Sequence, residues 1–150
     1  MEKRTGQHTG NTGRIFDVTI KHEVDTDSDT SELGTFDDAP RSKYAIRHSK
    51  GDHRVMDWFN PNWENYKGCT QKEIREYCRQ DYQRAKSYGQ EWGYVGIIVT
   101  ASLENVELGN ASLWGIEDDG GDDYIATTEK DLILDAIHDA EANLAKLQAA

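Results

Sequence analysis

The sequence predicts an α+β fold in which an antiparallel sheet of about four strands carries two helices on one face. Three observations support this class: segments that alternate apolar and polar residues, two segments with apolar residues at helical spacing, and the order of these segments along the chain. That order is strand, strand, helix, strand, strand, helix. A chain of 150 residues has the usual length of one domain. We therefore expect a flexible tail over 1–13 and a single domain over 14–150.

The first half of the chain is expected to supply two strands. Residues 1–13 are rich in Gly, Thr, Asn and Gln and show no periodicity, which predicts the tail. Residues 14–23 alternate between apolar and polar side chains, which predicts a half-buried strand. The acidic, Ser- and Thr-rich stretch over 25–40 indicates a loop, and a second, short strand is expected over 43–48.

A helix is predicted over 70–88. Thr70 and Glu73 have the spacing of a capping box, in which each side chain bonds the backbone N–H of the other. Apolar residues recur behind them at helical spacing, and Gly89 provides the residue type that commonly ends a helix. The middle of the chain therefore carries a capped helix.

The C-terminal part of the chain predicts two strands and a long helix. Residues 93–102 are apolar on both faces, which indicates a central strand. Residues 106–116 return as its neighbour, with a bulge at Gly109. A sustained apolar stripe over 127–148 predicts a helix, with Thr128 as its N-cap.

Charge is unevenly distributed along the chain. The 28 acidic and 17 basic residues give a net charge of −11. Residues 1–86 sum to zero, so the whole excess lies in 87–150, where 13 acidic residues accompany only Lys130 and Lys146. Contacts to phosphate need Lys and Arg, so we expect no direct binding to nucleic acid. The expected partner is a protein that is itself basic.

The acidic residues of this region predict a partner-binding surface. Three aspartates recur every four residues along the C-terminal helix, about 6 Å apart, on the scale of the phosphate spacing along a DNA strand. Four more lie in the glycine-containing segment before that helix. An ordinary solvated face is the alternative, because most runs of charge are one. The expected partner-binding residues are Asp118, Asp119, Asp122, Asp123, Asp131, Asp135 and Asp139.

A cluster of aromatic residues surrounds an Asn-Pro-Asn turn over 60–62. Large aromatic side chains on such an irregular segment either fill a core or form an interface, and filling a core is the commoner use. The alternative is a homodimer. Its interface would be made by Trp58, Phe59, Trp63 and Tyr66.

No sequence motif predicts a metal or cofactor site. Asp25, Asp27 and Asp29 have the spacing that opens a calcium-binding loop. Such a loop then needs Gly and Glu where this chain has Thr30 and Phe36. We therefore expect no metal and no cofactor.

The two cysteines leave one enzymatic alternative open. Cys69 and Cys78 would lie roughly 13 Å apart on a helix, too far for a disulfide, so reduced thiols are expected. Their spacing, with that of His48 and His53, does not match a zinc site. Cys69 immediately precedes the predicted helix, which favours its thiolate. A cysteine-dependent enzyme with His48 or His53 as the base is therefore the alternative.

The segment EWGYVGIIVT over 91–100, followed by SLWGIE over 112–117, resembles small uncharacterised phage and prophage accessory proteins. In these, a strand, a turn, a strand with an SLWGIE-like ending and a C-terminal helix recur. The resemblance covers about 60 residues at the C-terminal end. It implies a phage or prophage origin. Because small acidic phage proteins are often inhibitors of host defence, it also implies, by analogy, an inhibitor of the anti-CRISPR or anti-restriction type.

Hydropathy and the first residues favour a cytoplasmic protein. No apolar run approaches the roughly 20 residues that a membrane-spanning helix needs, and 1–14 lack the apolar region of a secretory signal. We therefore expect a non-enzymatic protein of the host cytoplasm, without membrane contact, that binds a basic nucleic-acid-binding host protein through its acidic surface. A homodimeric interaction module and a small cysteine enzyme remain as alternatives.

Overall fold

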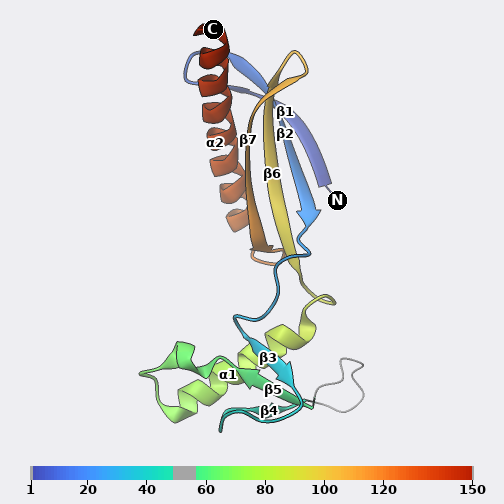
Figure 1. Ribbon diagram of the computed structural model, residues 1–150, viewed down its shortest axis with the longest axis vertical. Coiled ribbons are helices and arrows are strands. Elements are labelled where there is room, and N and C mark those ends of the chain that lie inside the picture. Colours follow the sequence, from blue (N-terminus) through green and yellow to red (C-terminus); the bar gives the residue numbers. More distant parts are fainter. Residues whose placement is uncertain (1, 49–56, 150) are drawn as a thin grey trace. The chain divides into compact units, whose positions relative to one another are not determined.

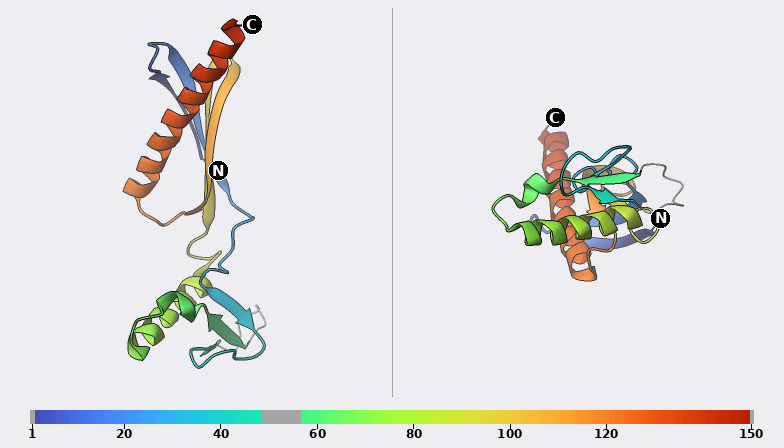
Figure 2. Two further views of the ribbon diagram at one scale, coloured as in Figure 1. Left: turned by 60° about the vertical axis from the view of Figure 1, so that its left-hand side comes forward. Right: turned by 90° about the horizontal axis from the view of Figure 1, so that it is seen from below.

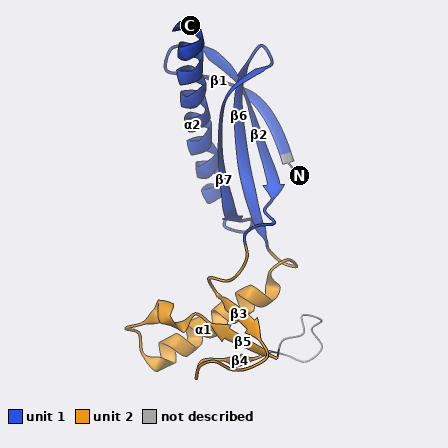
Figure 3. Cartoon of the chain, viewed as in Figure 1, with its two compact units in different colours: residues 1–28, 93–150 blue, residues 29–92 orange. Residues whose placement is uncertain are grey.

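The computed structural model describes residues 2–48 and 57–149 and confirms the α+β class, with an antiparallel sheet of four strands and two α-helices (Figure 1). The chain divides into two compact units (Figure 3). Unit 1 is formed by Met1–Ser28 together with Gly93–Ala150, and unit 2 by residues 29–92. The structure therefore differs from the single domain that the length of the chain suggested.

Unit 1 consists of the four-stranded sheet and one long helix. Its strands are β1 (Glu2–Thr9), β2 (Ile15–Val24), β6 (Tyr94–Leu103) and β7 (Val106–Glu117), which lie in this order across the sheet and are antiparallel throughout. Helix α2 (Asp122–Ala149) lies along one face of the sheet (Figures 1 and 2). Unit 2 is thus inserted between β2 and β6, which are neighbours in the sheet.

The core of unit 1 lies between this sheet and α2. Alternate residues of β2 and β6 point toward the helix, as the periodicity of both segments predicted. The helix contributes a stripe of apolar residues with alanines at its centre. The buried residues are Phe16, Val18, Ile97, Val99, Ala101, Ile116, Leu132, Ala136, Ile137 and Ala140.

Gly109 of β7 allows α2 to lie very close to the sheet. A β-carbon at this position would lie 2.5 Å from the Ala140 nitrogen, closer than such carbons approach any atom, and would also meet the Ala136 carbonyl oxygen. Ala136 and Ala140 are themselves fully buried. The bulge expected at Gly109 is found one residue earlier, because Gly109 pairs with Ala101 and Glu107 with Ser102, which leaves Leu108 as the extra residue.

The N-terminal residues form an edge strand, which corrects the flexible tail expected over 1–13. Strand β1 pairs with β2 along its whole length, from Glu2 opposite His22 to Thr9 opposite Ile15. Because β1 is polar on both faces, its sequence carries no apolar alternation. Its order comes from the ladder with β2 and from contacts with α2 that lie far away in the sequence.

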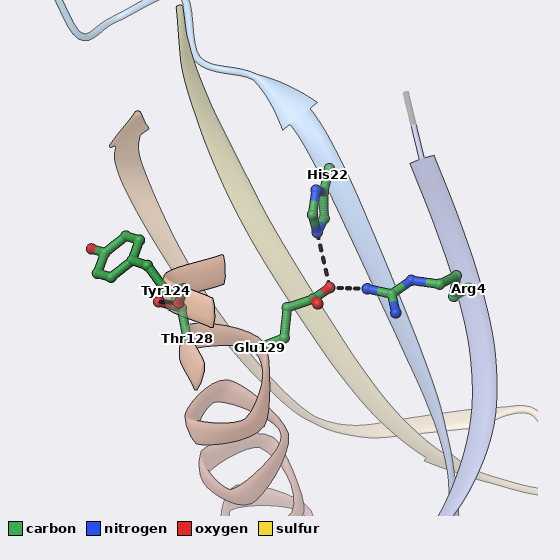
Figure 4. Close-up of polar contacts among 5 residues, drawn as sticks. All are labelled: Arg4, His22, Tyr124, Thr128 and Glu129. Carbon is green, nitrogen blue, oxygen red and sulfur yellow. Dashed lines mark hydrogen bonds and ion pairs between the residues drawn. The ribbon is translucent and has the colours of Figure 1, made fainter. Parts of the chain in front are cut away.

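Helix α2 begins at Asp122, five residues before the predicted start. Thr128 is therefore not its N-cap: its hydroxyl donates to the carbonyl oxygen of Tyr124, 2.9 Å away within the helix (Figure 4). Asp122 and Asp123 occupy the first turn, where their negative charge is favourable beside the free N–H groups of the helix.

Unit 2 has a sheet of its own. Strands β3 (Gly34–Asp37), β5 (Trp58–Pro61) and β4 (Ile46–Arg47) lie in that order, followed in the chain by the 3-10 helix η1 (Trp63–Tyr66) and helix α1 (Gln71–Ser87). The sequence suggested that both α-helices pack on one face of a single sheet. This expectation is wrong, because α1 belongs to unit 2 and α2 to unit 1. The segment over 25–40, which was expected to be a loop, contains β3. The aromatic segment around the turn over 60–62 forms β5 and η1.

Helix α1 begins with the predicted capping box. The Glu73 N–H donates to the Thr70 hydroxyl, and the Thr70 N–H donates to the Glu73 carboxylate. The helix then packs against η1, β3 and β5. Its buried residues belong to the two apolar clusters of unit 2, one around Phe59 and Tyr82 and one around Tyr44 and Cys78.

Substitution of Gly109 by Ala tests the close contact between β7 and α2. We expect Gly109→Ala to lower the free energy of unfolding by about 1–3 kcal/mol, because the new methyl group collides with the helix backbone. Gly6→Ala in β1 is the matched control, because nothing lies within 4 Å of a β-carbon there. Denaturant unfolding compares the two variants. Equal stability of both would contradict the close contact.

Candidate partner-binding surface of unit 1

The net charge of the protein belongs entirely to unit 1. Residues 1–28 and 93–150 hold 17 acidic and 6 basic side chains, a net charge of −11. Residues 29–92 hold 11 of each and are neutral overall. The acidic region expected from the sequence therefore coincides with a folded unit, in which the excess charge is carried by defined strands, turns and a helix.

All seven aspartates predicted as partner-binding residues lie in unit 1. Two of them lie between β7 and α2, two in the first turn of α2 and three along that helix. All are exposed except the last, which is half-buried. In this order they are Asp118, Asp119, Asp122, Asp123, Asp131, Asp135 and Asp139.

Two of these seven carboxylates bond the backbone of unit 1 itself. Asp139 accepts the N–H of Asn110 on β7 at 3.1 Å, and Asp118 accepts the N–H of Gly93 at 3.0 Å. Next to Asp139, the side-chain amide of Asn143 donates to the carbonyl oxygen of Leu108 at 2.7 Å. Helix α2 thus satisfies polar groups along the outer edge of β7, which would otherwise offer a pairing site to another strand.

The opposite flank of α2 holds the turn between β1 and β2. Glu141 accepts the backbone N–H groups of Asn11 and Thr12 at 3.2 and 2.9 Å. These bonds, Thr12 first, lower the pKa of Glu141 below its ordinary value. The carboxylate therefore stays ionised at neutral pH and fixes the N-terminal hairpin to the helix.

Glu129 makes the third contact between α2 and the strands, and it is buried, with 8% of its surface exposed. Its Oε2 accepts a hydrogen bond from the Arg4 guanidinium on β1 and lies 2.9 Å from Nε2 of His22 on β2 (Figure 4). Burial raises the pKa of Glu129, but the bonds and charges of Arg4 and His22 together outweigh burial and lower it. Glu129 is therefore an ionised anchor for β1 and β2.

A pocket of about 370 Å³ lies beside this anchor within unit 1. It brings two of the predicted aspartates together with three residues that sequence reasoning missed. Its polar lining residues are Arg4, His22, Asp118, Asp122 and Glu129, and Val95, Ile125 and Ala126 supply the apolar part. Within the described ranges, no cluster of three or more His, Cys, Asp or Glu side chains has an arrangement that would hold a metal ion.

The sequence does contain a signal for Glu129. Ile125, Ile133 and Ile137 are spaced by multiples of four along one side of α2, and Glu129 occupies the missing position in that series. A charged residue on an apolar stripe is buried only when it is paired. Its partner Arg4 carries no comparable signal, because it comes from a polar stretch of the chain, whereas His22 continues the inward-facing alternation of Val18 and Ile20 in β2.

Four of the predicted aspartates are left without such internal roles. Asp122, Asp123, Asp131 and Asp135 are exposed, and among the described residues no basic side chain forms an ion pair with any of them. We call these four the outward aspartates. Because the like charges of Asp131 and Asp135 lie one turn apart, they cost the helix a few tenths of a kcal/mol, so local helix stability does not explain their presence.

The aromatic residues considered as a dimer interface belong largely to the core of unit 2. Phe59 is 0% exposed and packs against Tyr82, so it lies outside any interface. Trp63 and Tyr66 are half-buried and pack on the cluster around Tyr44 and Cys78. Trp58 is also half-buried, with the Arg47 guanidinium 5.3 Å from the centre of its ring.

The residues of the cysteine-enzyme alternative lie in contrasting environments. Cys69 is exposed, whereas His48 is buried with Nδ1 2.9 Å from the Tyr82 hydroxyl. His53 lies outside the described residues. Burial and, to a lesser extent, Asp81 raise the pKa of Cys78 to about 11, so this thiol is not ionised at neutral pH.

Asp25, the first residue of the calcium-like spacing, has a structural role. Its buried carboxylate accepts the N–H groups of Asp27 and Ser28, the Ser28 hydroxyl and the N–H of Gly115 on β7. These bonds, the Ser28 hydroxyl first, lower the pKa of Asp25. The aspartate thus ties the end of β2 to β7.

Comparisons of this chain with family models, with curated proteins and with solved structures gave no match. In the part of the chain that the structure describes, no helix is long and apolar enough to cross a membrane.

Replacement of Glu129 by Gln tests the buried anchor. We expect Glu129→Gln to lower the free energy of unfolding at pH 7 by about 1–3 kcal/mol, because the charge that pairs with Arg4 is lost. The folded-state pKa of Glu129 is depressed, so its contribution is present above the ordinary value of 4.5 and is lost as the pH falls through the folded value. The difference from the unsubstituted protein should therefore shrink below about pH 4.5.

Asp131→Asn is the matched control for this experiment, because Asp131 is an exposed carboxylate on the same helix. Denaturant unfolding at neutral and acid pH measures all three proteins. If Glu129→Gln is no more destabilising than Asp131→Asn, Glu129 is not the anchor of β1 and β2.

Proposed function

We propose that this chain is a non-enzymatic protein that binds a basic protein surface through the outward aspartates of unit 1. One observation carries the proposal: unit 1 holds the whole net charge of −11, and its exposed helix face presents carboxylates that lack basic partners among the described residues. Unit 2 carries no net charge to balance it.

The division of the acidic residues supports a binding role for the outward aspartates. Glu129, Glu141 and Asp139 already bond strands or turns, so engaging them would weaken the fold. Asp131 and Asp135 are free to pair with a partner at no such cost. They stand about 6 Å apart along the helix, a spacing close to that of neighbouring phosphates on a nucleic acid.

The partner that fits this surface is a nucleic-acid-binding protein. Its basic groove would meet the outward aspartates in place of phosphates, while the net charge of unit 1 repels nucleic acid itself. Charges of this kind mainly speed association and make it sensitive to salt. The resemblance to phage accessory proteins favours a host defence complex of the CRISPR or restriction type as the target, with the cytoplasm as the place of action.

Capture experiments with charge-reversal variants test this function. The immobilised protein is exposed to a bacterial lysate at low ionic strength, and the retained proteins are identified by mass spectrometry. We expect nucleic-acid-binding proteins that are released by salt and by added duplex DNA. Asp131→Lys with Asp135→Lys should reduce the binding of these proteins by about tenfold, because two attractive charges become repulsive.

The matched control reverses two other exposed acidic residues of unit 1, Glu104→Lys and Glu107→Lys, which change the net charge equally. These lie at and just after the turn between β6 and β7, away from the outward aspartates. If both double variants lose binding of the retained proteins equally, the net charge of unit 1 alone explains the binding, and the outward aspartates have no special role. If neither salt nor added duplex DNA releases the retained proteins, the proposed binding surface is wrong.

A further inference from the structure

A second pocket of unit 1, of about 310 Å³, opens between α2 and the turn that joins β1 to β2. Its apolar part comes from Ile137, which is buried, and from Leu134, which is exposed. Its polar groups come from the turn and from Asp135, His138 and Glu141 of the helix. The pocket therefore combines an apolar side with carboxylates along one flank of α2.

The two sides of this pocket are held together by bonds within the fold. Glu141 accepts the backbone N–H groups of Asn11 and Thr12, which fixes the turn against the helix. Gly10, which also lines the pocket, allows this close approach, because a β-carbon there would lie 2.8 Å from the Cδ carbon of Glu141. The pocket is therefore formed before a ligand arrives, which lowers the entropic cost of binding one.

The charges around the pocket favour a cation. Asp135 and Glu141 are carboxylates, and the described residues that line the pocket include no lysine or arginine. Lys130, one turn before Leu134 along the helix, lies outside this lining. An anion is further disfavoured by the net charge of −11 on unit 1.

Leu134 points to a cation that also has an apolar part. It is 59% exposed and is followed by Asp135, one of the outward aspartates. Lysine and arginine lay their methylene stems on apolar surface while the charged end stays among polar groups. A leucine beside a carboxylate matches both parts of such a side chain. A small inorganic cation would use only the carboxylates and leave the leucine uncovered.

We propose that this pocket receives one long basic side chain, a lysine or an arginine, of the basic partner. The methylene stem of that side chain packs on Leu134, and its charged end pairs with Asp135. Glu141 stays bonded to the turn and adds its negative charge to the pocket.

The pocket is continuous with the outward aspartates. Asp135 belongs to both, and Asp131 lies one helical turn before it on the same side of α2. A basic partner that contacts these two aspartates therefore has the pocket within its contact area. This inference rests on the proposed function, since it adds a side-chain pocket to the same binding surface.

The test uses the full-length protein with ¹³C-labelled leucine methyl groups and a capped hexa-lysine peptide as the probe. The methyl signals are followed by NMR during a titration at neutral pH and low salt. We expect a saturable shift of the Leu134 signal and nuclear Overhauser contacts between its methyl groups and the lysine methylenes. Leu147 is the internal control, because it is 63% exposed on the same helix but does not line the pocket.

A second peptide separates the stem from the charge. A capped hexapeptide of diaminobutyrate carries the same charge on shorter side chains. It should bind about fivefold more weakly than hexa-lysine, because its stems cover less apolar surface. Equal binding of the two peptides would mean that charge alone is recognised, and it would overturn the inference.

Two matched variants complete the test. Leu134→Gln should weaken the binding of hexa-lysine by about fivefold, because it removes the apolar contact without changing the charge. Leu147→Gln makes the same exchange outside the pocket and should leave binding unchanged. An unchanged methyl signal of the buried Leu132 confirms that each variant is folded.

Three results overturn the inference. One is a Leu134 signal that has not moved at the end of the titration, and another is an equal loss of binding with both leucine variants. The third is a Leu134 shift that follows protein concentration without peptide, because the occupant would then be a second copy of this chain.

The result is separable from that of the proposed function. If Leu134→Gln retains the lysate proteins that Asp131→Lys with Asp135→Lys loses, the acidic surface stands and the side-chain pocket fails. If neither variant loses them, both proposals fail.

Discussion

The close contact between α2 and β7 at Gly109 is the constraint on which the rest of unit 1 depends. With no side chain at this position, the helix backbone lies directly on the strand. Carboxylates on both flanks of the helix then reach the backbone of the sheet, Asp139 at Asn110 on one side and Glu141 at Thr12 on the other. The same proximity buries Glu129 between the helix and the first two strands.

This geometry divides one acidic helix into two groups with different roles. The flanking carboxylates replace the water that backbone N–H groups and Arg4 would otherwise bind, so they stabilise the fold. Among the outward aspartates, Asp131 and Asp135 make no stabilising contact within the fold, and helix propensity alone would not select neighbouring like charges. We propose that a complementary basic partner stabilises Asp131 and Asp135, whose mutual repulsion the monomer leaves uncompensated.

Local patterns predicted the elements whose signal is local. The capping box of Thr70 and Glu73 marked the start of α1, and the apolar alternation of β2 and β6 marked both strands within one or two residues. Strand β1 was missed because its ladder and its Arg4 contact depend on partners such as Glu129, 125 positions away. The second unit was missed because nothing in the segment order reveals that β2 and β6 are sheet neighbours. Asp139 was predicted as a partner contact but bonds Asn110, since its angular position on α2 is fixed only by packing.

Amide hydrogen exchange across residues 2–12 and at Asn110 tests the central claim most directly. That claim is that the flanking carboxylates of α2 hold the sheet, the N-terminal hairpin included. We predict slower exchange than in an unstructured peptide for the β1 amides that pair with β2. The same slow exchange is expected for the amide of Thr12, which Glu141 accepts, and for that of Asn110, which Asp139 accepts. Exchange of these amides at the rate of an unstructured peptide would contradict the account, because the N-terminus would then be a free tail and the carboxylates of α2 would have no internal role.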